Sequence, residues 1–146
     1  MIKAEELQDR IHRHIPLAKA MQFSIDELDP GAIRVSAPLE PNINIHGTGF
    51  AGSIYSLAVL TGWALCTHIL EDAKIDAELV VARGEIRYRA PVTGELHCAT
   101  EADARARDAF LQATRDAGKG MLRLDINVGD APQAVLSATF CALLPK

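Results

Sequence analysis

A long stretch without a charged side chain constrains this sequence more than any other feature. From Pro41 to Leu70 the chain contains no Asp, Glu, Lys or Arg. Its first part, 42–49, is polar and rich in glycine, and its second part, from about Gly52, is apolar on every side. A helix that is apolar all round must be surrounded by protein or by lipid. The stretch therefore predicts a polar loop that leads into a buried helix.

The junction between this loop and the helix is the first candidate for chemistry. Gly and Ser suit a helix N-terminus, where free backbone N–H groups carry partial positive charge. The N–H groups of Ala51, Gly52 and Ser53 are therefore expected to bind a negative group, such as the oxygen of a reacting carbonyl. The alternative is that the glycines only permit tight turns and close packing, and both interpretations can hold together.

The apolar segment is just long enough to cross a bilayer, so a membrane span has to be considered. The segment carries Ser, Thr, Gly and His, acidic residues follow it directly, and no basic cluster or aromatic belt flanks it. The rest of the chain has alternating segments that can form strands around a helix. We therefore expect a buried helix of a soluble protein with no membrane partner.

Size and composition are those of one soluble domain, expected over residues 1–146. A net charge of −4 argues against nucleic-acid binding. The three cysteines are far apart and lack metal-ligand spacing, so they are expected to be reduced, buried thiols. The N-terminal residues lack the apolar core of a signal peptide. The sequence thus predicts a cytoplasmic protein without a metal site.

Periodicity in the remaining chain predicts a mostly antiparallel sheet of about five or six strands. Residues 3–15 have the spacing of an amphipathic helix, and 103–118 fit either a short helix or an extension of the sheet. The segments with alternating apolar residues are 23–26, 33–37, 78–89, 95–102 and 121–128, and the segment 134–144 is apolar on both faces. The strand at 78–89 can bend at Gly84. Short turns join most of the segments. A curved sheet with one apolar face, wrapped around the apolar helix, buries both, so the expected fold class is α+β.

Three pieces of the sequence resemble the hotdog-fold thioesterases. They are N-I-H-G-T-G-F-A-G-S-I-Y-S-L-A at 44–58, I-R-Y-R-A-P-V-T-G-E-L at 86–96 and A-V-L-S-A-T-F-C-A-L-L at 134–144. The resemblance covers nearly the whole chain and is strongest to a thioesterase family that in some proteins is fused behind an acetyltransferase domain. It implies a hotdog fold and a homodimer with one continuous sheet, or a homotetramer of two such dimers. It also implies an acyl thioester bound between the protomers.

The related phenylacetate-degradation type of hotdog thioesterase has an Asn-x-His-Gly loop, then His-Gly-Gly at the helix start and a carboxylate within the helix. The resemblance places Asn44 and His46 in the loop. The His-Gly-Gly falls on 50–52, which keeps only its last glycine, and the carboxylate falls on Val59. The helical acid that serves as base or nucleophile in that type is therefore missing here.

The resemblance and the residue chemistry together suggest roles for the two loop residues. His46 is the candidate general base, because imidazole titrates near neutral pH, and its alternative is a histidine bonded within the loop. Asn44 either orients water or the thioester, or satisfies the loop backbone. The developing oxyanion would lie on the N–H groups at the helix start.

Further residues are candidates for binding substrate. Phe50 and Ser56 lie at or near the helix start, and their alternatives are packing and helix capping. Thr61 lies further along the helix and is a candidate to project into the partner's site, its alternative being a hydroxyl that bonds back to the helix. Arg87 and Arg89 belong to a basic set that could receive the phosphates of coenzyme A or of a carrier's phosphopantetheine, or else form a solvated strand face. Because that group is part of the substrate, no separate cofactor is expected.

The sequence therefore predicts an acyl thioesterase that acts on coenzyme A or carrier-protein thioesters. The missing carboxylate favours a second hypothesis, a non-catalytic module that binds acyl thioesters. A third hypothesis is dehydration of a 3-hydroxyacyl thioester, which normally needs a histidine and a carboxylate facing each other across the dimer. Nothing acidic on the predicted central helix supplies that carboxylate.

Overall fold

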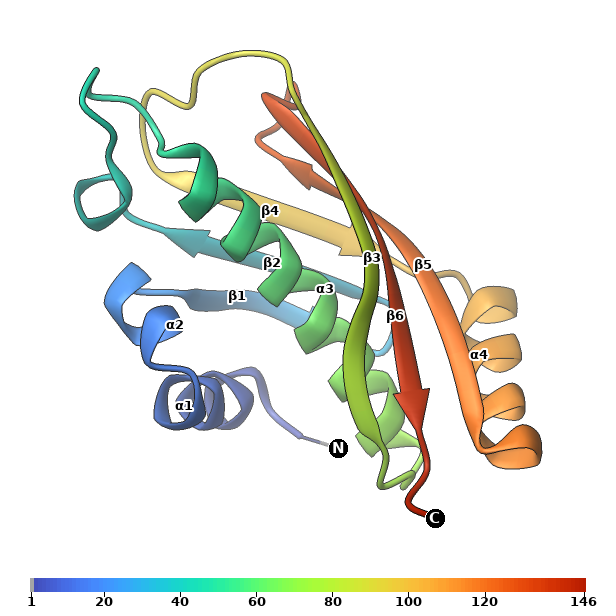
Figure 1. Ribbon diagram of the computed structural model, residues 1–146. Helices are drawn as coiled ribbons and strands as arrows, with labels where there is room; N and C mark the ends of the chain where they lie inside the picture. The colour runs from blue at the N-terminus through green and yellow to red at the C-terminus, as the bar shows by residue number, and fades with distance from the viewer. Residues whose placement is uncertain (1) are drawn as a thin grey trace.

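A six-stranded sheet wraps around one long helix in the structure, a computed structural model that describes residues 2–146 (Figure 1). The elements in chain order are α1 (Ala4–His14), α2 (Pro16–Met21), β1 (Ser24–Asp29), β2 (Ala32–Ala37), the 3-10 helix η1 (Glu40–Asn42), α3 (Ala51–Asp72), β3 (Glu78–Tyr88), β4 (Leu96–Glu101), α4 (Ala104–Ala117), β5 (Lys119–Val128) and β6 (Ala134–Leu143). The strand order is β1-β2-β4-β5-β6-β3, and every neighbouring pair is antiparallel. The predicted α+β class is confirmed.

The central helix α3 is buried because it is apolar on nearly every side. Leu57, Ala64 and Leu65 have no exposed surface, and 67% of the helix's most apolar 18-residue window is buried within this fold. By length and composition alone α3 would also pass as a membrane span, and burial among the strands accounts for the same composition. The sheet approaches α3 closely at Gly62, where an added Cβ would lie 2.5 Å from the ring of Phe140.

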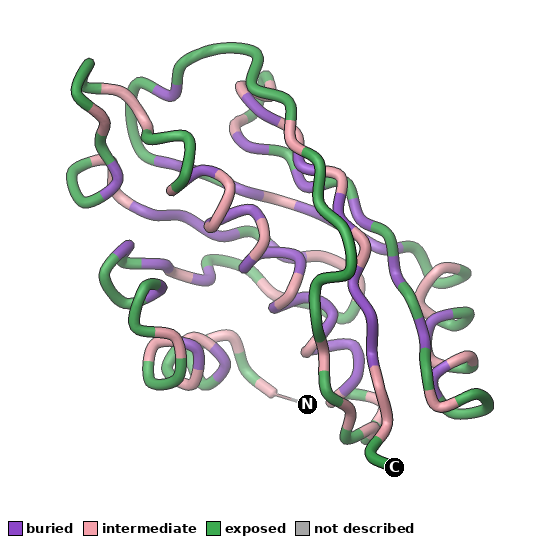
Figure 2. The backbone as a smooth tube through the Cα atoms, viewed as in Figure 1, coloured by how far each residue is buried: buried purple, intermediate pink, exposed green. Residues whose placement is uncertain are grey.

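Alternation along the strands gives the sheet one core face and one outer face. In β5, Leu122 and Leu124 are buried whereas Met121 and Arg123 are exposed. Figure 2 shows this alternation along the strands, and it also shows that most of β3 and of the loop before α3 is exposed. The core face covers α3, as the apolar pattern predicted.

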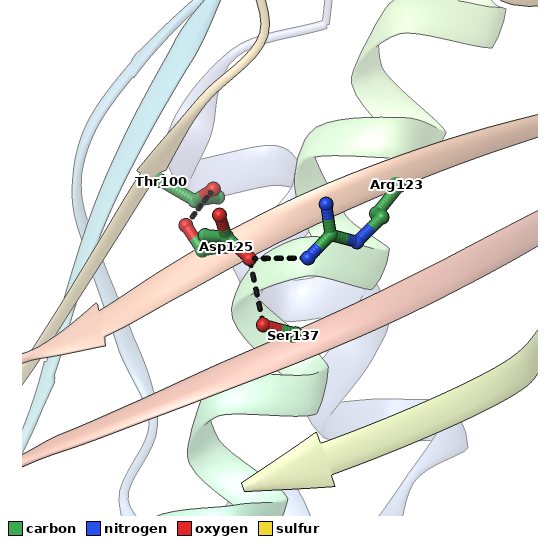
Figure 3. Close-up of polar contacts among 4 residues, drawn as sticks. All are labelled: Thr100, Arg123, Asp125 and Ser137. Atoms are coloured by element: carbon green, nitrogen blue, oxygen red, sulfur yellow. Dashed lines mark hydrogen bonds and ion pairs between the residues drawn. The ribbon is translucent and has the colours of Figure 1, made fainter. Parts of the chain in front are cut away.

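The strands β4 and β5 pair over only two positions, 98–99 with 127–128. Beyond this seam the two strands diverge, and the Thr100 hydroxyl crosses the gap by donating to the Asp125 backbone oxygen at 2.9 Å (Figure 3). The Asp125 carboxylate in turn accepts a 2.7 Å hydrogen bond from the Ser137 hydroxyl on β6. The Thr100 hydrogen bond thus links β4 and β5 where the backbone ladder is missing, and the Ser137 hydrogen bond joins β5 to β6, which are already fully paired.

The segment 103–118, which the sequence left open between helix and strand, contains the helix α4. Asp103 caps it, because its Oδ1 accepts a 2.8 Å hydrogen bond from the Ala106 N–H. Gly118 ends it in the left-handed conformation at φ +75°. The helix packs beside β5 (Figure 1).

The N-terminal helix α1 packs against the body of the fold and is tied to the end of α3. Leu7 and Ile11 are buried on its apolar side. On its other side, Arg10 donates to both carboxylate oxygens of Glu71, at 2.6 and 2.8 Å. Hydrogen bonding to Glu71 is the main reason that the pKa of Arg10 is raised above its ordinary value. This two-point contact fixes α1 beside the C-terminal half of α3.

Candidate active site

The loop before α3 is held in shape by the side chain of Asn44. Its Oδ1 accepts hydrogen bonds from the backbone N–H groups of His46, at 2.9 Å, and Thr48, at 3.1 Å. Its Nδ2 donates to Thr48 Oγ1, at 2.8 Å, and to the Gly49 oxygen, at 3.3 Å. An amide side chain has two donor hydrogens and an acceptor oxygen with two lone pairs, and all of these are used inside the loop. Asn44 therefore positions the loop and has no free group to orient water.

His46 lies at the tip of this loop with its side chain exposed. Gly47 follows it at φ +81°, a conformation that completes the turn and that side-chain-bearing residues rarely adopt. Three apolar side chains beside His46 are also exposed: Ile43 at 49%, Ile45 at 94% and Phe50 at 53%. So much apolar surface on one short loop is typical of a contact region.

The helix α3 begins directly after the loop without a side-chain cap. Phe50 occupies the N-cap position and makes no capping hydrogen bond, and the first intrahelical bond runs from the Ile54 N–H to the Phe50 oxygen at 3.0 Å. Within residues 2–146, no acceptor is found for the N–H groups of Ala51, Gly52 and Ser53. These three N–H groups and the positive end of the helix dipole form a site suited to an oxyanion.

Tyr88 lies at this helix start, and sequence reasoning missed it. Its hydroxyl donates to the Ala51 backbone oxygen at 2.8 Å and so ties the end of β3 to the first turn of α3. Burial, with a smaller contribution from Tyr55, raises the pKa of Tyr88 above its ordinary value, so the hydroxyl remains a donor at neutral pH. The alternation of β3 was the available signal, because Tyr88 lies on the same side of the strand as Gly84, against which the Tyr55 hydroxyl packs.

Between Ala51 and Leu70 no acid lies on the partly exposed side of α3, and the acids Glu71 and Asp72 follow only at its far end. Ser53, Ser56, Val59 and Trp63 are half-buried along that side. Val59, where the resemblance places a carboxylate, therefore presents only an isopropyl group. Among the residues described by the structure, no cluster of His, Cys, Asp or Glu is suited to a metal ion either. Of the predicted site residues on this side, the imidazole of His46 remains the only titratable group.

Three further residues predicted to bind substrate are not part of the helix start itself. Thr61 is fully buried, and its hydroxyl donates to the Leu57 oxygen at 2.7 Å, so it is not available to substrate within this chain. Arg87 is exposed, and it points to the outer face of the sheet because its neighbour Tyr88 points toward α3. Arg89 is exposed just past the end of β3. Binding of phosphates by these two arginines stays a prediction.

A cavity of about 670 Å³ lies near the other end of α3. It opens between α1, the C-terminal half of α3 and the start of β3. Trp63 forms part of its wall and donates its indole N–H to the Leu79 oxygen at 3.2 Å. The apolar side chains that line it are Ile11, Ile15, Trp63, Leu70, Ile75, Ala77 and Leu79. The ionisable residues in the lining are Arg10, His14, Glu71, Lys74 and Asp76.

Comparison with known proteins shows a family and solved structures that share this fold. Residues 4–142 match the family model described as "Putative thioesterase (yiiD_Cterm)". A "putative thioesterase" from Shewanella oneidensis is 30% identical, with a TM-score of 0.86 and 97% of each chain covered. A protein of unknown function from Chlorobaculum tepidum TLS is 27% identical, with a TM-score of 0.93 over 97% of this chain and 94% of the other. A "probable thioesterase" from Pseudomonas aeruginosa, 22% identical, has a TM-score of 0.85 over 97% and 96%. The hotdog fold implied by the resemblance is confirmed.

Proposed function

Because the chain belongs to the family described as "Putative thioesterase (yiiD_Cterm)", we propose that it hydrolyses acyl thioesters of coenzyme A or of an acyl carrier protein. The observation that carries this proposal is the uncapped start of α3. Three backbone N–H groups are free there, and the loop that leads into the helix is tightly held and carries the exposed imidazole of His46. Thioester hydrolysis needs such donors at the carbonyl oxygen and a base for water.

The reaction assigns one role to each part of the site. His46 accepts a proton from water while the water oxygen bonds to the thioester carbon. The carbonyl oxygen becomes negative and is stabilised by the N–H groups of Ala51, Gly52 and Ser53. The C–S bond then breaks, and the thiolate takes the proton from the imidazolium. The products are a carboxylic acid and a free thiol. Asn44 contributes by fixing the backbone of His46.

We also propose that the active form is a homodimer joined through β3, alone or in a dimer of dimers. β3 is an edge strand, and Val80 and Val81 on it are 40% and 41% exposed. A long edge strand with exposed apolar side chains readily pairs with another strand. Antiparallel pairing with a copy of itself obeys two-fold symmetry and extends the sheet through both protomers. Val81→Lys is expected to shift the dimer toward monomer in light-scattering measurements.

The oxyanion site is tested by Ala51→Pro, which deletes one N–H. Ala51 is the first helical residue, where proline is well tolerated, and Phe50 before it has φ −69° and ψ 131°, which suit a residue that precedes proline. Loss of one oxyanion donor lowers kcat about 10²–10³-fold in known enzymes. We expect such a loss in a thiol-release assay over a panel of acyl-CoAs, with stability unchanged.

The matched control is Ala104→Pro at the first position of α4, where the preceding Asp103 has φ −69° and ψ 167°. It makes the same chemical change away from the site and should leave activity intact. If the wild type releases no thiol from any acyl-CoA above background, the hydrolase proposal is lost. Thermal stabilisation of that inactive protein by acyl-CoAs would favour the second candidate function, a non-catalytic module that binds acyl thioesters. The presence of Val59 where the related type has a carboxylate supports this candidate.

A further inference from the structure

We propose that Tyr88 is a positioning residue for thioester hydrolysis: its hydroxyl fixes the peptide group between Ala51 and Gly52, so that the Gly52 N–H stays aimed at the oxyanion. This inference rests on the proposed hydrolase function. It assigns the orientation of a backbone donor in the helix to one side chain outside the helix. In this proposal Tyr88 does not touch the reacting atoms, because its hydroxyl proton is held by the Ala51 oxygen.

The first step is the geometry of a peptide group. A peptide is planar and trans, so its C=O and its N–H point in opposite directions and turn together. The Ala51 oxygen and the Gly52 nitrogen belong to the same peptide. At the start of α3 the oxygen points along the helix, and the N–H points out of its N-terminal end. The 2.8 Å hydrogen bond from Tyr88 to the Ala51 oxygen therefore fixes the direction of the Gly52 N–H as well.

The second step is that this peptide needs support from outside the helix. No side-chain cap holds the first turn of α3, and helix ends fray. Position 52 accommodates glycine because a Cβ there would lie 2.6 Å from the ring of Phe50. Glycine, however, leaves the preceding peptide freer to rotate than any other residue would. Rotation would turn the N–H away from the oxyanion and present the Ala51 oxygen in its place.

The third step is that Tyr88 is carried by an anchored strand end. It is the last residue of β3 and pairs with Ala134 of β6. Directly after it, the N–H groups of Arg89 and Ala90 both donate to the Gln133 oxygen, at 2.7 and 3.1 Å. A side chain on such a supported element can hold a neighbouring group in one geometry. The Tyr88 hydroxyl is therefore a fixed point for the start of α3.

The segment 88–92 holds the chain on both sides of the helix boundary. Before the boundary, the Gly49 N–H donates to the Val92 oxygen at 2.8 Å. After it, the Tyr88 hydroxyl donates to the Ala51 oxygen. In Figure 1 the end of β3 and the loop after it lie at the same end of the fold as the start of α3. The end of the loop and the first turn of the helix are thus tied to one segment.

The hydrogen bond from Tyr88 also strengthens the donor that it orients. An O–H that donates to a carbonyl polarises the peptide and makes the N–H of the same peptide a better donor. An oxyanion donor acts most strongly when the carbonyl oxygen becomes negative, which occurs in the transition state. Loss of the Tyr88 hydroxyl is therefore expected to lower kcat and kcat/KM together.

The first measurement is the kinetics of Tyr88→Phe, which removes the hydroxyl and keeps the ring. Tyr88 is 48% exposed, so the variant should fold and keep its Tm within a few degrees. Loss of a whole oxyanion donor costs about 10²–10³-fold in kcat, so loosening one donor should lower kcat about tenfold. KM should stay within about twofold of the wild-type value, because substrate binding in the ground state is unchanged.

The matched control is Tyr55→Phe. It makes the same chemical change on a nearby tyrosine, whose hydroxyl packs against Gly84 instead of the helix start. Its kcat should equal that of the wild type. A Tyr88→Phe variant with an unchanged kcat would overturn the proposal, and so would a loss of kcat/KM that comes from a raised KM alone.

The second measurement is NMR of the peptide between Ala51 and Gly52. Tyr88→Phe should shift the carbon resonance of the Ala51 carbonyl, because that oxygen loses a donor. It should also produce relaxation dispersion at the Gly52 amide, which reports exchange on the μs–ms timescale. The wild type and Tyr55→Phe should show neither change. Absence of exchange at Gly52 in Tyr88→Phe would refute the positioning role even if kcat falls.

The outcomes separate this proposal from the hydrolase. An active wild type whose Tyr88→Phe variant keeps its kcat overturns the role of Tyr88 and leaves the hydrolase standing. A wild type without thiol release overturns the hydrolase. The support of the helix start by Tyr88 is then judged by the Gly52 amide alone: exchange that appears only in Tyr88→Phe supports it, and equal behaviour in all three proteins refutes it.

Discussion

Replacement of Gly62 by alanine tests how closely the sheet is packed on the central helix. Gly62 lies in the middle of α3, where glycine is an unfavourable residue for a helix. An added Cβ at this position would lie 2.5 and 2.6 Å from two ring atoms of Phe140 and 3.3 Å from Ile126 Cδ1. The ring of Phe140 is fully buried, so it has no open space into which to move.

Two opposing effects set the expected change in the free energy of unfolding. Alanine improves helix propensity by about 1 kcal/mol. Overpacking of a filled core costs about 1–3 kcal/mol. We therefore expect Gly62→Ala to destabilise the protein by about 1 kcal/mol, which lowers Tm by roughly 2–4 °C for a domain of this size.

A double-mutant cycle with Phe140→Leu separates the two effects. Phe140→Leu alone should cost about 1–2 kcal/mol, because it leaves a small cavity. In that background the added methyl group has room, so Gly62→Ala should become stabilising by up to about 1 kcal/mol. Urea unfolding followed by circular dichroism measures all four proteins. Stabilisation by Gly62→Ala in the wild-type background would refute the close approach of β6 to α3.

Three further predictions follow from buried or fully bonded side chains. His68 is 1% exposed without a partner for either ring nitrogen among residues 2–146, and burial lowers its pKa below 6.5. Below about pH 6.5 the unfolded chain binds a proton at His68 that the folded protein does not bind, so the free energy of unfolding should fall as the pH drops. Urea unfolding at several pH values should show this dependence in the wild type and a flatter one in His68→Leu. Burial raises the pKa of the Cys66 thiol, and it raises the pKa of the Cys98 thiol to about 12. Neither thiol should therefore react with a disulfide reagent at about pH 8 until the protein unfolds. Rapid labelling of either thiol in the folded protein would contradict this. Asn44→Asp keeps two of the four hydrogen bonds of this side chain within the loop, and Asn44→Ala keeps none. With a lysine introduced at the loop tip as a cleavage site, trypsin should cut the wild-type loop slowest, the Asp variant faster and the Ala variant fastest. Equal cleavage rates would refute the role of Asn44 in holding the loop.

Periodicity was sufficient to predict most of the fold, because burial on one face leaves a regular mark on the sequence. The charge-free run predicted α3, and the alternation in 121–128 predicted β5. The helix α2 was missed, since six residues after a proline carry too little periodicity to separate a turn of helix from a lead-in to β1. The irregularity in β3 lies between Val81 and Arg83 rather than at the predicted Gly84, because bulges follow pairing with β6.

The candidate site was predicted only where it depends on backbone groups. Free N–H groups at a helix start follow from the start itself, so Ala51 and its two successors could be named from the sequence. Side-chain roles depend on contacts between distant segments. Tyr88 contacts Ala51 across thirty-seven positions of the chain, and the alternation of β3 indicates only which face of the strand Tyr88 occupies, not the residue that it contacts. The bonding of Asn44 within its own loop was one of two stated alternatives, and only the geometry selects it.

The narrow seam between β4 and β5 makes the sheet a structure of two panels. One panel is β1, β2 and β4, the other is β5, β6 and β3, and only 98–99 with 127–128 continue the ladder between them. The helix α3 contacts strands of both panels and so packs against both of them. Partial unfolding that begins where β4 meets β5 breaks few backbone hydrogen bonds, so the two panels can separate before either of them unfolds.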